Sequence, residues 1–265
     1  MGLKKLVIIC FVILVAGAAI SIFLNIKDTL ESKTGEILVE NTKYKNIDVI
    51  SDNSSVVFLP TKDSVTKVEY SGKMKSKSKY KFNAEVKKDT LYVELTEKRW
   101  GFIQFGFTSM DIELTVHVPE KEYNEIIANI DNGRITVKDI QAKDIQLETD
   151  NGLINLKDTI SDTVKIRTDN GQIMMDNVEG NIEASTDNGR IVLVTNNLER
   201  SISLSTDNGF IEIQTDKEPT NVTIDADLDV GKLNVFGNSS KQTVFGDGKN
   251  LIQLETDNGS IKVGK

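Results

Sequence analysis

Apolar and polar positions alternate around a recurring Asp-Asn-Gly triplet in the second half of the chain. Apolar residues stand five and three positions before each Asp, and four and six positions after it. In the copy at Asp150 these residues are Ile145, Leu147, Ile154 and Leu156. Alternation with period two indicates a strand with one buried face. Each repeat therefore predicts two short strands joined by a turn.

The triplet recurs at nearly constant spacing, which is typical of a repeat architecture. The first five copies are separated by 19, 19, 18 and 20 residues. Glycine permits a left-handed backbone at such a corner, and asparagine tolerates one. The predicted structural turns are Asp131, Asn132, Gly133, Asp150, Asn151, Gly152, Asp169, Asn170, Gly171, Asp187, Asn188, Gly189, Asp207, Asn208, Gly209, Asp257, Asn258 and Gly259.

Two architectures fit this pattern. A two-residue Asn-Gly loop suits a β-hairpin, and successive hairpins would form an antiparallel meander. A two-strand coil of about 19 residues suits a parallel β-solenoid. Stacked coils reuse one residue at every level, and Asn and Thr ladders would be stabilised by hydrogen bonds between identical neighbours. The sameness of the copies favours the solenoid. The sequence thus predicts an all-β fold with a parallel β-solenoid (β-helix) of about seven regular coils over residues 126–265.

The rest of the chain is less regular. The same template fits around Asp52, which predicts an outlying first coil, and a degenerate copy occurs at Asp229-Val230-Gly231. We expect a stalk at 26–45 with a short strand at 37–39, and an irregular β-strand region at 46–125. Further strands are expected near 67–70, 80–86, 91–95 and 110–118. The Gly- and Ser-rich segment 236–250 is interpreted as a loop.

The N-terminus carries an apolar segment. Residues 6–24 form an uncharged run of about 19 residues, close to the length that crosses a bilayer. Lys4 and Lys5 precede it, so residues 1–25 predict one transmembrane helix with a cytoplasmic N-terminus. The chain would then be a single-pass cell-membrane protein with an extracytoplasmic domain. A signal peptide cleaved near Ala18 is the alternative, but the apolar run continues past that residue. A lipoprotein at Cys10 is disfavoured because Ile9 precedes it.

Composition excludes several function classes. The formal net charge is −8 and the pI is about 4.9, so nucleic acid is not an expected partner. The single cysteine, Cys10, lies in the apolar run, so the folded part has no disulfide and no thiolate metal site. The single histidine, His117, lies in an alternating segment and is interpreted as an exposed strand residue. No catalytic, cofactor-binding or metal-binding residues are predicted.

Two features of the irregular region stand out as candidate surface contacts. Five lysines alternate with other residues and would share one face of a strand: Lys73, Lys75, Lys77, Lys79 and Lys81. They would contact anionic lipid headgroups or an anionic envelope polymer, or else only protect a strand edge. Four aromatic residues follow, at Trp100, Phe102, Phe105 and Phe107. They would form a partner or membrane-interface contact, or else plug the open end of the solenoid core.

The repeated aspartates raise a third question. Stacked coils place equivalent carboxylates about 4.8 Å apart, so the column must be hydrogen-bonded, screened or bridged by cations. We expect each Asp to accept backbone N–H bonds at its own turn. The array lacks the Gly-Gly-x-Gly-x-Asp pattern of calcium-binding β-rolls.

The chain resembles a bacterial β-strand-repeat family of unknown function known as "putative adhesin". The resemblance rests on residues 47–58, on Leu91-Tyr-Val-Glu-Leu95, on the Val118–Tyr123 lead-in and on the repeated Thr-Asp-Asn-Gly. It implies an extracytoplasmic β-helical module, and it carries over no catalytic residue. An anchor followed by such a domain is similar in layout to a protein encoded with the Lia cell-envelope stress genes of Gram-positive bacteria.

The leading function hypothesis is a membrane-anchored, non-enzymatic scaffold or binding module, linked to cell-envelope stress by that layout. Its partners would be the membrane, an anionic envelope polymer or a membrane protein. One alternative is a β-helix enzyme acting on polysaccharide, by analogy of fold alone. Another is a regulatory partner of a membrane signalling system. We expect the contact surface in the irregular segment 73–107 and not on the regular ladder, because that segment departs from the repeat.

Overall fold

The computed structural model describes residues 30–76, 78–98 and 111–265. These residues form strands and connecting loops, and none of them belongs to a helix long enough to cross a bilayer. The expected anchor at 1–25 lies outside the described residues. The strands are β1 (Leu30–Val39), β2 (Asn46–Thr61), β3 (Thr66–Lys75), β4 (Lys79–Lys87), β5 (Thr90–Lys98), β6 (Ile112–Pro119), β7 (Glu122–Lys138), β8 (Gln141–Val194), β9 (Ile202–Gln214), β10 (Val222–Val235), β11 (Gln242–Phe245) and β12 (Asn250–Gly264).

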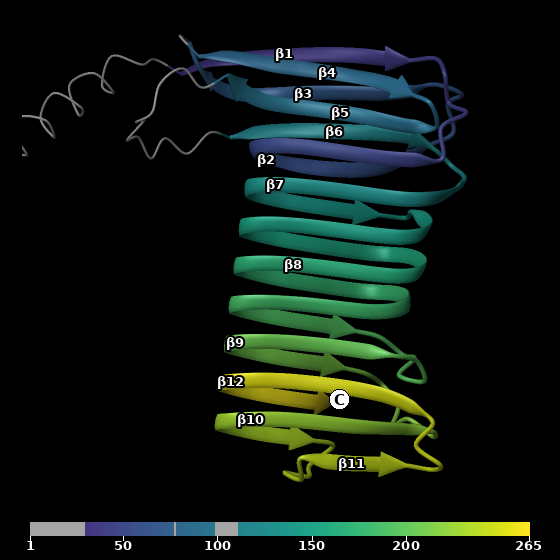
Figure 1. Cartoon of the computed structure of the whole chain (residues 1–265), viewed down its shortest axis with the longest axis vertical. Helices are drawn as coiled ribbons and strands as arrows, with labels where there is room; N and C mark the ends of the chain where they lie inside the picture. Colours follow the sequence, from purple (N-terminus) through teal and green to yellow (C-terminus); the bar gives the residue numbers. More distant parts are fainter. Residues whose placement is uncertain (1–29, 77, 99–110) are drawn as a thin grey trace, which may run out of the picture.

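Each repeat forms one rung of a stack (Figure 1). A rung runs along one sheet, turns at its Asp-Asn-Gly corner and returns along a second sheet. We name these the pre-corner sheet and the post-corner sheet. Neighbouring rungs pair in parallel and in register, as Ile126 with Ile145 and Ile135 with Ile154 show. Parallel pairing confirms the solenoid and excludes the meander.

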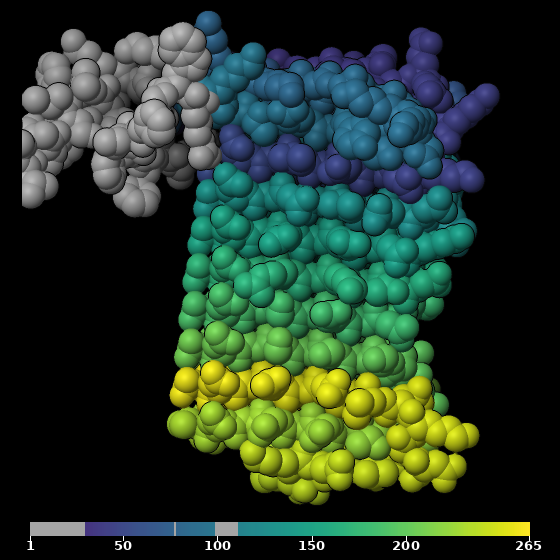
Figure 2. All heavy atoms as spheres, viewed as in Figure 1, coloured from purple at the N-terminus to yellow at the C-terminus, as the bar shows by residue number. Residues whose placement is uncertain are grey.

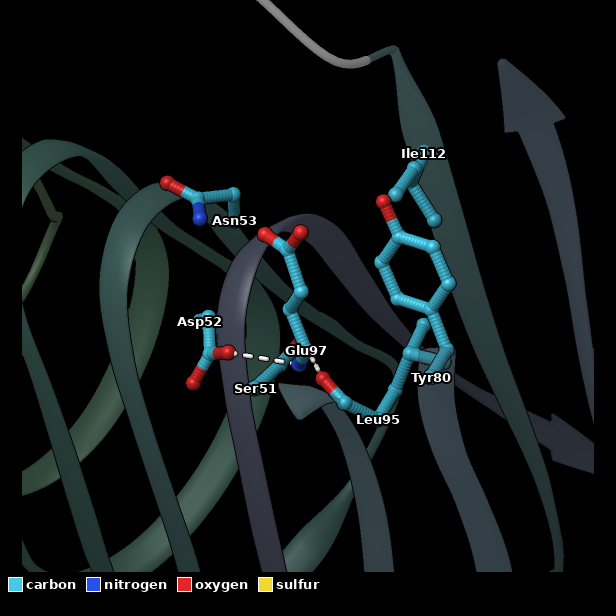
Figure 3. A pocket seen from close by; sticks show the side chains of 7 residues that line it. All are labelled: Ser51, Asp52, Asn53, Tyr80, Leu95, Glu97 and Ile112. Atoms are coloured by element: carbon cyan, nitrogen blue, oxygen red, sulfur yellow. Dashed lines mark hydrogen bonds between the residues drawn. The ribbon is translucent and has the colours of Figure 1, made fainter. Parts of the chain in front are cut away.

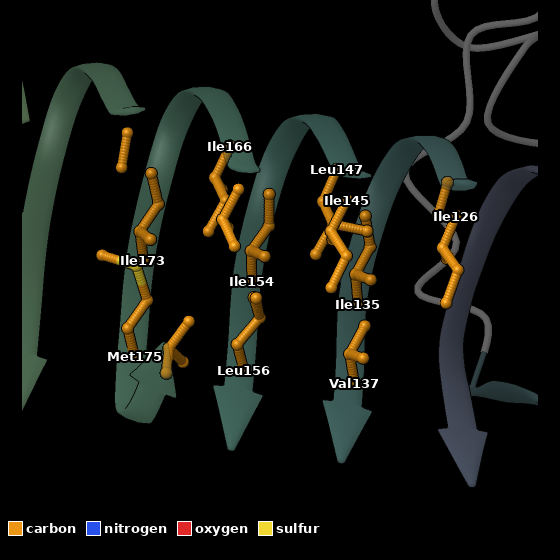
Figure 4. Close-up of a cluster of buried hydrophobic side chains, with 14 of the residues drawn as sticks. Ile126, Ile135, Val137, Ile145, Leu147, Ile154, Leu156, Ile166, Ile173 and Met175 are labelled. Atoms are coloured by element: carbon orange, nitrogen blue, oxygen red, sulfur yellow. The ribbon is translucent and has the colours of Figure 1, made fainter. Parts of the chain in front are cut away.

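The core lies between the two sheets. Residues at equivalent positions stack on one another, as the ladder from Ile135 through Ile154 to Ile173 shows (Figure 4). All three of these side chains have 0% exposed surface. Full burial of such a side chain stabilises a fold by roughly 1.5–3 kcal/mol. One residue pattern therefore builds the core at every level.

The asparagines of the corners form a hydrogen-bonded ladder. Each carboxamide N–H donates to the side-chain oxygen of the preceding rung, at 2.9 Å from Asn151 to Asn132 and 3.2 Å from Asn170 to Asn151. The ladder starts at Asn53, in the first coil predicted around Asp52. The complete series is Asn53, Asn132, Asn151, Asn170, Asn188, Asn208 and Asn258. The predicted Asn ladder is confirmed.

The expected threonine ladder is wrong. The threonines before the corner point inward, and the hydroxyls of four of them are buried without a hydrogen-bond partner: Thr168, Thr186, Thr206 and Thr256. Neighbouring rungs are about 4.8 Å apart, whereas hydroxyl pairs need about 2.5–3.0 Å. The buried threonines therefore stack without hydrogen bonds between their hydroxyls.

The glycines of the corners are required by close approach between rungs. A Cβ added at Gly171 would overlap with the carbonyl oxygen of Gly152, and the same holds for Gly189 against Gly171. The backbone freedom expected of the corner glycines is used at Gly133, whose φ is +143°, whereas Gly171 does not have a positive φ. No residue with a side chain fits between these backbones without a shift of the stack.

The C-terminal strand does not follow sequence order. β12 lies between β9 and β10 and pairs in parallel with both. Figure 2 shows this yellow rung above the green rung that precedes it in sequence. The complete copy at Asn258 thus extends the Asn ladder, whereas the degenerate copy at Val230 occupies the last rung.

The C-terminal end of the core is covered. The segment 236–250, interpreted as a loop, contains the short strand β11, which pairs antiparallel with β10. Phe236 and Phe245 pack edge to face, with ring centroids 5.4 Å apart, against the core. This aromatic pair and β11 cap the lower end of the stack.

The N-terminal end is a two-sheet cap built on β2. The pre-corner sheet continues from β2 to β5 and β4, and the post-corner sheet continues to β6, β3 and β1. The four strands expected in this region are present. The stalk interpretation is wrong for residues 30–39, because they form β1, which pairs with β3 over ten residues. The expected strand at 37–39 is the end of this longer one.

Candidate functional site

The N-terminal cap differs from the array of repeated rungs at the corner between the two sheets. β5 pairs with the pre-corner half of β2, and β6 pairs with its post-corner half. The level above β2 therefore has no Asp-Asn-Gly corner, and the chain leaves β5 at Lys98 and enters β6 at Ile112. We name this place the cap corner. The aromatic cluster of Trp100, Phe102, Phe105 and Phe107 belongs to the connection and lies outside the described residues.

Hydrogen bonds close the cap corner on its inner side (Figure 3). The Ser54 hydroxyl donates to Ser51 at 2.7 Å, and the Ser51 hydroxyl donates to the carbonyl of Leu95 at 2.8 Å. The backbone N–H of Glu97 donates to the carboxylate of Asp52 at 2.7 Å. The adjoining hollow holds about 10 Å³, the space of a single water. Among the described residues, this hollow leaves no room for a substrate.

The lysines do not lie along one strand, so that expectation is wrong. β3 ends at Lys75 and β4 begins at Lys79, because the chain reverses between the two sheets of the cap. Lys73 is exposed on β3, and Lys79 and Lys81 are exposed on β4. Lys77 lies outside the described residues. The alternation in sequence therefore continues across a chain reversal and does not describe one face.

The described lysines have different partners. The Lys81 amine forms an ion pair with Glu94 at 2.5 Å, and this hydrogen bond holds the pKa of the Glu94 carboxyl below its usual range. Lys79 stands opposite Lys98 in the β4–β5 pair. The Lys33 amine donates to the carbonyl of Lys75 at 3.4 Å. Lys73, Lys75, Lys79 and Lys98 remain gathered at one edge of the cap.

The N-terminal end of β1 lies at this same edge. Leu30 pairs with Lys75, next to the end of β3. The Lys33 amine lies 5.7 Å from the ring centroid of Tyr80 on β4, so β1 and β4 meet there. Whatever precedes residue 30 enters the fold beside the cap corner (Figure 1).

A tyrosine–lysine cluster was not found from the sequence. The Lys121 amine donates to the carbonyls of Thr42 and Tyr44, at 2.5 and 2.6 Å. It also lies 4.4 Å from the ring centroid of Tyr44 and 5.0 Å from that of Tyr123. Burial lowers the pKa of the Lys121 amine. The Pro-Glu-Lys-Glu-Tyr segment was the available signal, but the partners on residues 42–44 are too distant in sequence to predict.

A shallow hollow of about 340 Å³ adjoins this cluster, beside Pro60, Pro119 and Ile140. Both tyrosine hydroxyls are engaged, since Tyr123 donates to the Pro119 carbonyl at 2.7 Å and Tyr44 bonds to Thr66. The bonds from Lys121 to Thr42 and Tyr44 tie the start of the first regular rung to the cap. The cluster therefore has a structural role.

The remaining candidates have ordinary surroundings. His117 lies on a strand as expected, but the expectation of an exposed side chain is wrong, because it is half-buried with its Nε2 3.0 Å from a carboxylate oxygen of Glu69. In the aspartate column, Arg167 bonds to Asp169 at 3.0 Å and to Asp187 at 3.2 Å, so a cation of the protein screens two carboxylates. Within the described ranges, no His, Cys, Asp and Glu side chains gather in a group that could hold a metal. Backbone bonds at each Asp's own turn stay a prediction.

A family model covers both the repeated rungs and most of the cap. The Toastrack family model (DUF4097) matches residues 44–264. The chain belongs to the Toastrack family. The resemblance to bacterial "putative adhesin" repeat proteins of unknown function is confirmed. The chain matches no curated protein.

Solved structures are similar at low identity. One is a "putative cell adhesion protein" from Clostridium sporogenes, with 15% identity and a TM-score of 0.45, over 88% of this chain and 99% of that one. Another is a "putative adhesin" from Bacteroides fragilis, with 14% identity and a TM-score of 0.45, over 87% and 97%. A "putative adhesin" from Parabacteroides distasonis has 12% identity and a TM-score of 0.36, over 87% and 97%. At this similarity they carry no argument about binding.

Proposed function

We propose that this Toastrack chain is a membrane-held, extracytoplasmic binding module without enzymatic activity. The observation that carries the proposal is the position of Leu30, which lies beside Lys75 at the cap corner. An anchor at residues 1–25 would therefore hold the cap corner next to the bilayer. The solenoid would project away from the membrane as a rigid scaffold.

The lysines at this edge suit an anionic lipid surface. Lys73, Lys75, Lys79 and Lys98 lie close to the entry of the chain. A lysine near such a surface contributes about 1 kcal/mol, and the contribution falls off within a Debye length. Lys81 contributes less, because its ion pair with Glu94 occupies its amine. Trp100 and Phe102 belong to the same connection in sequence, and aromatic residues suit the bilayer interface.

Topology is the first test of this proposal. Protease added to intact protoplasts is expected to digest the solenoid, because the domain lies outside the membrane. Survival of the domain would contradict the proposal. Release of the protein into the medium without detergent would instead mean cleavage near Ala18.

Two assays, of glycan turnover and of crosslinking, distinguish the proposed binding module from an enzyme and from a regulatory partner. Turnover of an envelope glycan by the purified full-length chain would favour a polysaccharide-acting enzyme. A membrane protein that crosslinks specifically to the cap corner would favour a regulatory partner. A link to cell-envelope stress stays a prediction from the layout of the anchor and the domain.

A further inference from the structure

The two sheets of the solenoid differ in the charge of their outward side chains. At the outward positions six, four and two residues before the Asp of each described rung, the charged side chains of the pre-corner sheet are mostly carboxylates, and the cations are Lys165 and Arg167. The carboxylates are Asp48, Glu125, Asp144, Glu148, Glu183, Asp225, Asp227 and Glu255. The aspartates of the corners add further negative charge beside this sheet. The acidic character of the protein is therefore concentrated on one sheet and its adjoining corner.

The post-corner sheet has the opposite character. Its outward carboxylates along the described rungs are Asp176 and Glu212. Its outward cations are Arg134, Lys138, Lys157, Arg190, Lys232 and Lys262. An acidic protein thus presents one cationic sheet, bordered by acidic corners. Nothing in the folding of the rungs requires this segregation, because all of these side chains point away from the core.

Three cations of this sheet share one column. Arg134, Arg190 and Lys232 all stand three positions after the Asp of their repeat. The stacking order places each of them three rungs from the next. Three rungs span roughly 14 Å, because the rungs of a parallel stack are about 4.8 Å apart. The column is a regularly spaced row of positive charge along the long axis.

Apolar side chains lie between these cations. Phe210 is 56% exposed, Met174 is 42% exposed and Val194 is 37% exposed, all on outward positions of this sheet. Phe210 stacks directly next to Arg190, its register partner in the neighbouring rung. Cations interleaved with exposed apolar groups suit a ligand that carries negative groups on a hydrocarbon-bearing backbone.

The ion pairs of this sheet are weak. Glu212 accepts from Lys262 at 3.1 Å and also pairs with Arg190, and Lys157 lies 3.4 Å from Asp176. The side chains of Lys157, Arg190 and Lys262 are each about half exposed. Exposed pairs contribute little to stability, so a ligand anion can replace the carboxylate. Arg134 and Lys232 form no ion pair with a described residue.

We propose that the post-corner sheet binds a linear phosphodiester polymer with a polyol backbone, laid along the column of Arg134, Arg190 and Lys232. Guanidinium groups match phosphate geometry with two parallel hydrogen bonds. Phe210, Met174 and Val194 would contact the C–H groups of the polyol. Several weak contacts along one flexible chain combine into useful affinity. This surface is separate from the cap corner, so the proposal stands apart from the bilayer contact.

The test uses the full-length chain in neutral detergent micelles with fluorescently labelled poly(glycerol phosphate). We expect saturable binding that weakens as salt is raised, because salt screens exposed charges. The variant Arg134→Gln/Arg190→Gln/Lys232→Gln is expected to lose affinity by about tenfold or more. The matched variant Lys165→Gln/Arg167→Gln removes two cations from the opposite sheet and is expected to change affinity by less than about twofold. Phe210→Ser is expected to reduce affinity by about threefold.

Three results would overturn the proposal. The first is the absence of binding by the unaltered chain at low salt. The second is an equal loss of affinity in the two charge variants, which would mean that overall charge and not this column binds the polymer. The third is equally tight binding of single-stranded DNA of matched length, which would remove the role of the polyol backbone. A thermal melt of each variant establishes that the stack is intact.

Discussion

The array of repeated rungs and the N-terminal cap cover the apolar core in different ways. In the array each rung is covered above and below by a rung of the same pattern, so Ile154 packs between Ile135 and Ile173. In the cap, β1 and β4 each pair on one side only and close the end by meeting each other. Rungs with the same sequence pattern therefore stack on one another, and segments that depart from the pattern form the ends of the stack.

The end rungs show this in single residues. The first coil has Ser54 where later corners have glycine, and its hydroxyl bonds to Ser51 below the cap corner. The last rung has Val230 where the others have asparagine, and Leu228 where most have threonine. Val230 ends the Asn ladder, because it offers no partner to Asn258. The end rungs are thus built to stop the ladders that the middle rungs propagate.

Removal of residues 250–265 is the strongest way to break the comparison. It deletes the rung between β9 and β10, with four core side chains, Ile252, Leu254, Ile261 and Val263. We expect a loss on the order of 6–12 kcal/mol for four such side chains. Hydrogen exchange should then show that β9 and β10 lose protection while β7 keeps it. Unchanged protection would mean that β10 stacks directly on β9.

A buried charge in the middle of the array is the next test. Ile173→Asp places a carboxylate in the core ladder and is expected to cost about 4 kcal/mol. The matched variant Gln172→Asp places the same group on the outward face and should change stability by less than about 0.5 kcal/mol. Denaturant unfolding measures both. Equal effects would contradict the assignment of the two faces.

Substitutions at two glycines distinguish the cost of steric overlap from the cost of backbone strain. Gly171→Ala would push a Cβ into the Gly152 carbonyl, so we expect a cost of about 2–4 kcal/mol from overpacking. Gly237→Ala meets no atom within 4 Å but has a φ of +84°, so only conformational strain of about 1 kcal/mol applies. Thermal unfolding of the two variants checks the ratio. A larger effect at Gly237 would overturn the close-approach argument.

The Asn ladder provides the smallest and most discriminating comparison. Asn170→Ala removes two ladder bonds, to Asn151 and Asn188, whereas Asn258→Ala removes one, to Asn208. Each net hydrogen bond contributes about 0.5–1.5 kcal/mol, so the first change should cost about twice as much. Equilibrium unfolding resolves the difference. Equal costs would show that the ladder does not act through its individual bonds.

The sequence was sufficient to predict the rungs because their period, inward positions and corners recur in every copy. It was not sufficient to predict the position of β12, because any two matching copies can pair in parallel. The only signal was the degenerate corner at Val230, which fits an end rung better than a middle one. The stacking order depends on which copies can end the side-chain ladders, and the spacing of the repeats carries no information about this.

The candidate site was harder to predict for a different reason. The lysines alternate in sequence across the chain reversal between β3 and β4, so the pattern wrongly predicted one strand face from residues of two sheets. Lys121 bonds to Thr42 and Tyr44, which are distant in sequence and share no pattern with it. The charge of the post-corner sheet became visible only once the rungs were in register.

Photocrosslinking in intact cells tests the central claim that the cap faces the membrane and the array projects from it. A photoreactive amino acid is placed at Lys73, on the cap, or at Lys249, at the far end of the stack, both of which are exposed. We expect lipid adducts from position 73 and none from position 249. Lipid adducts from position 249, with none from position 73, would contradict the account.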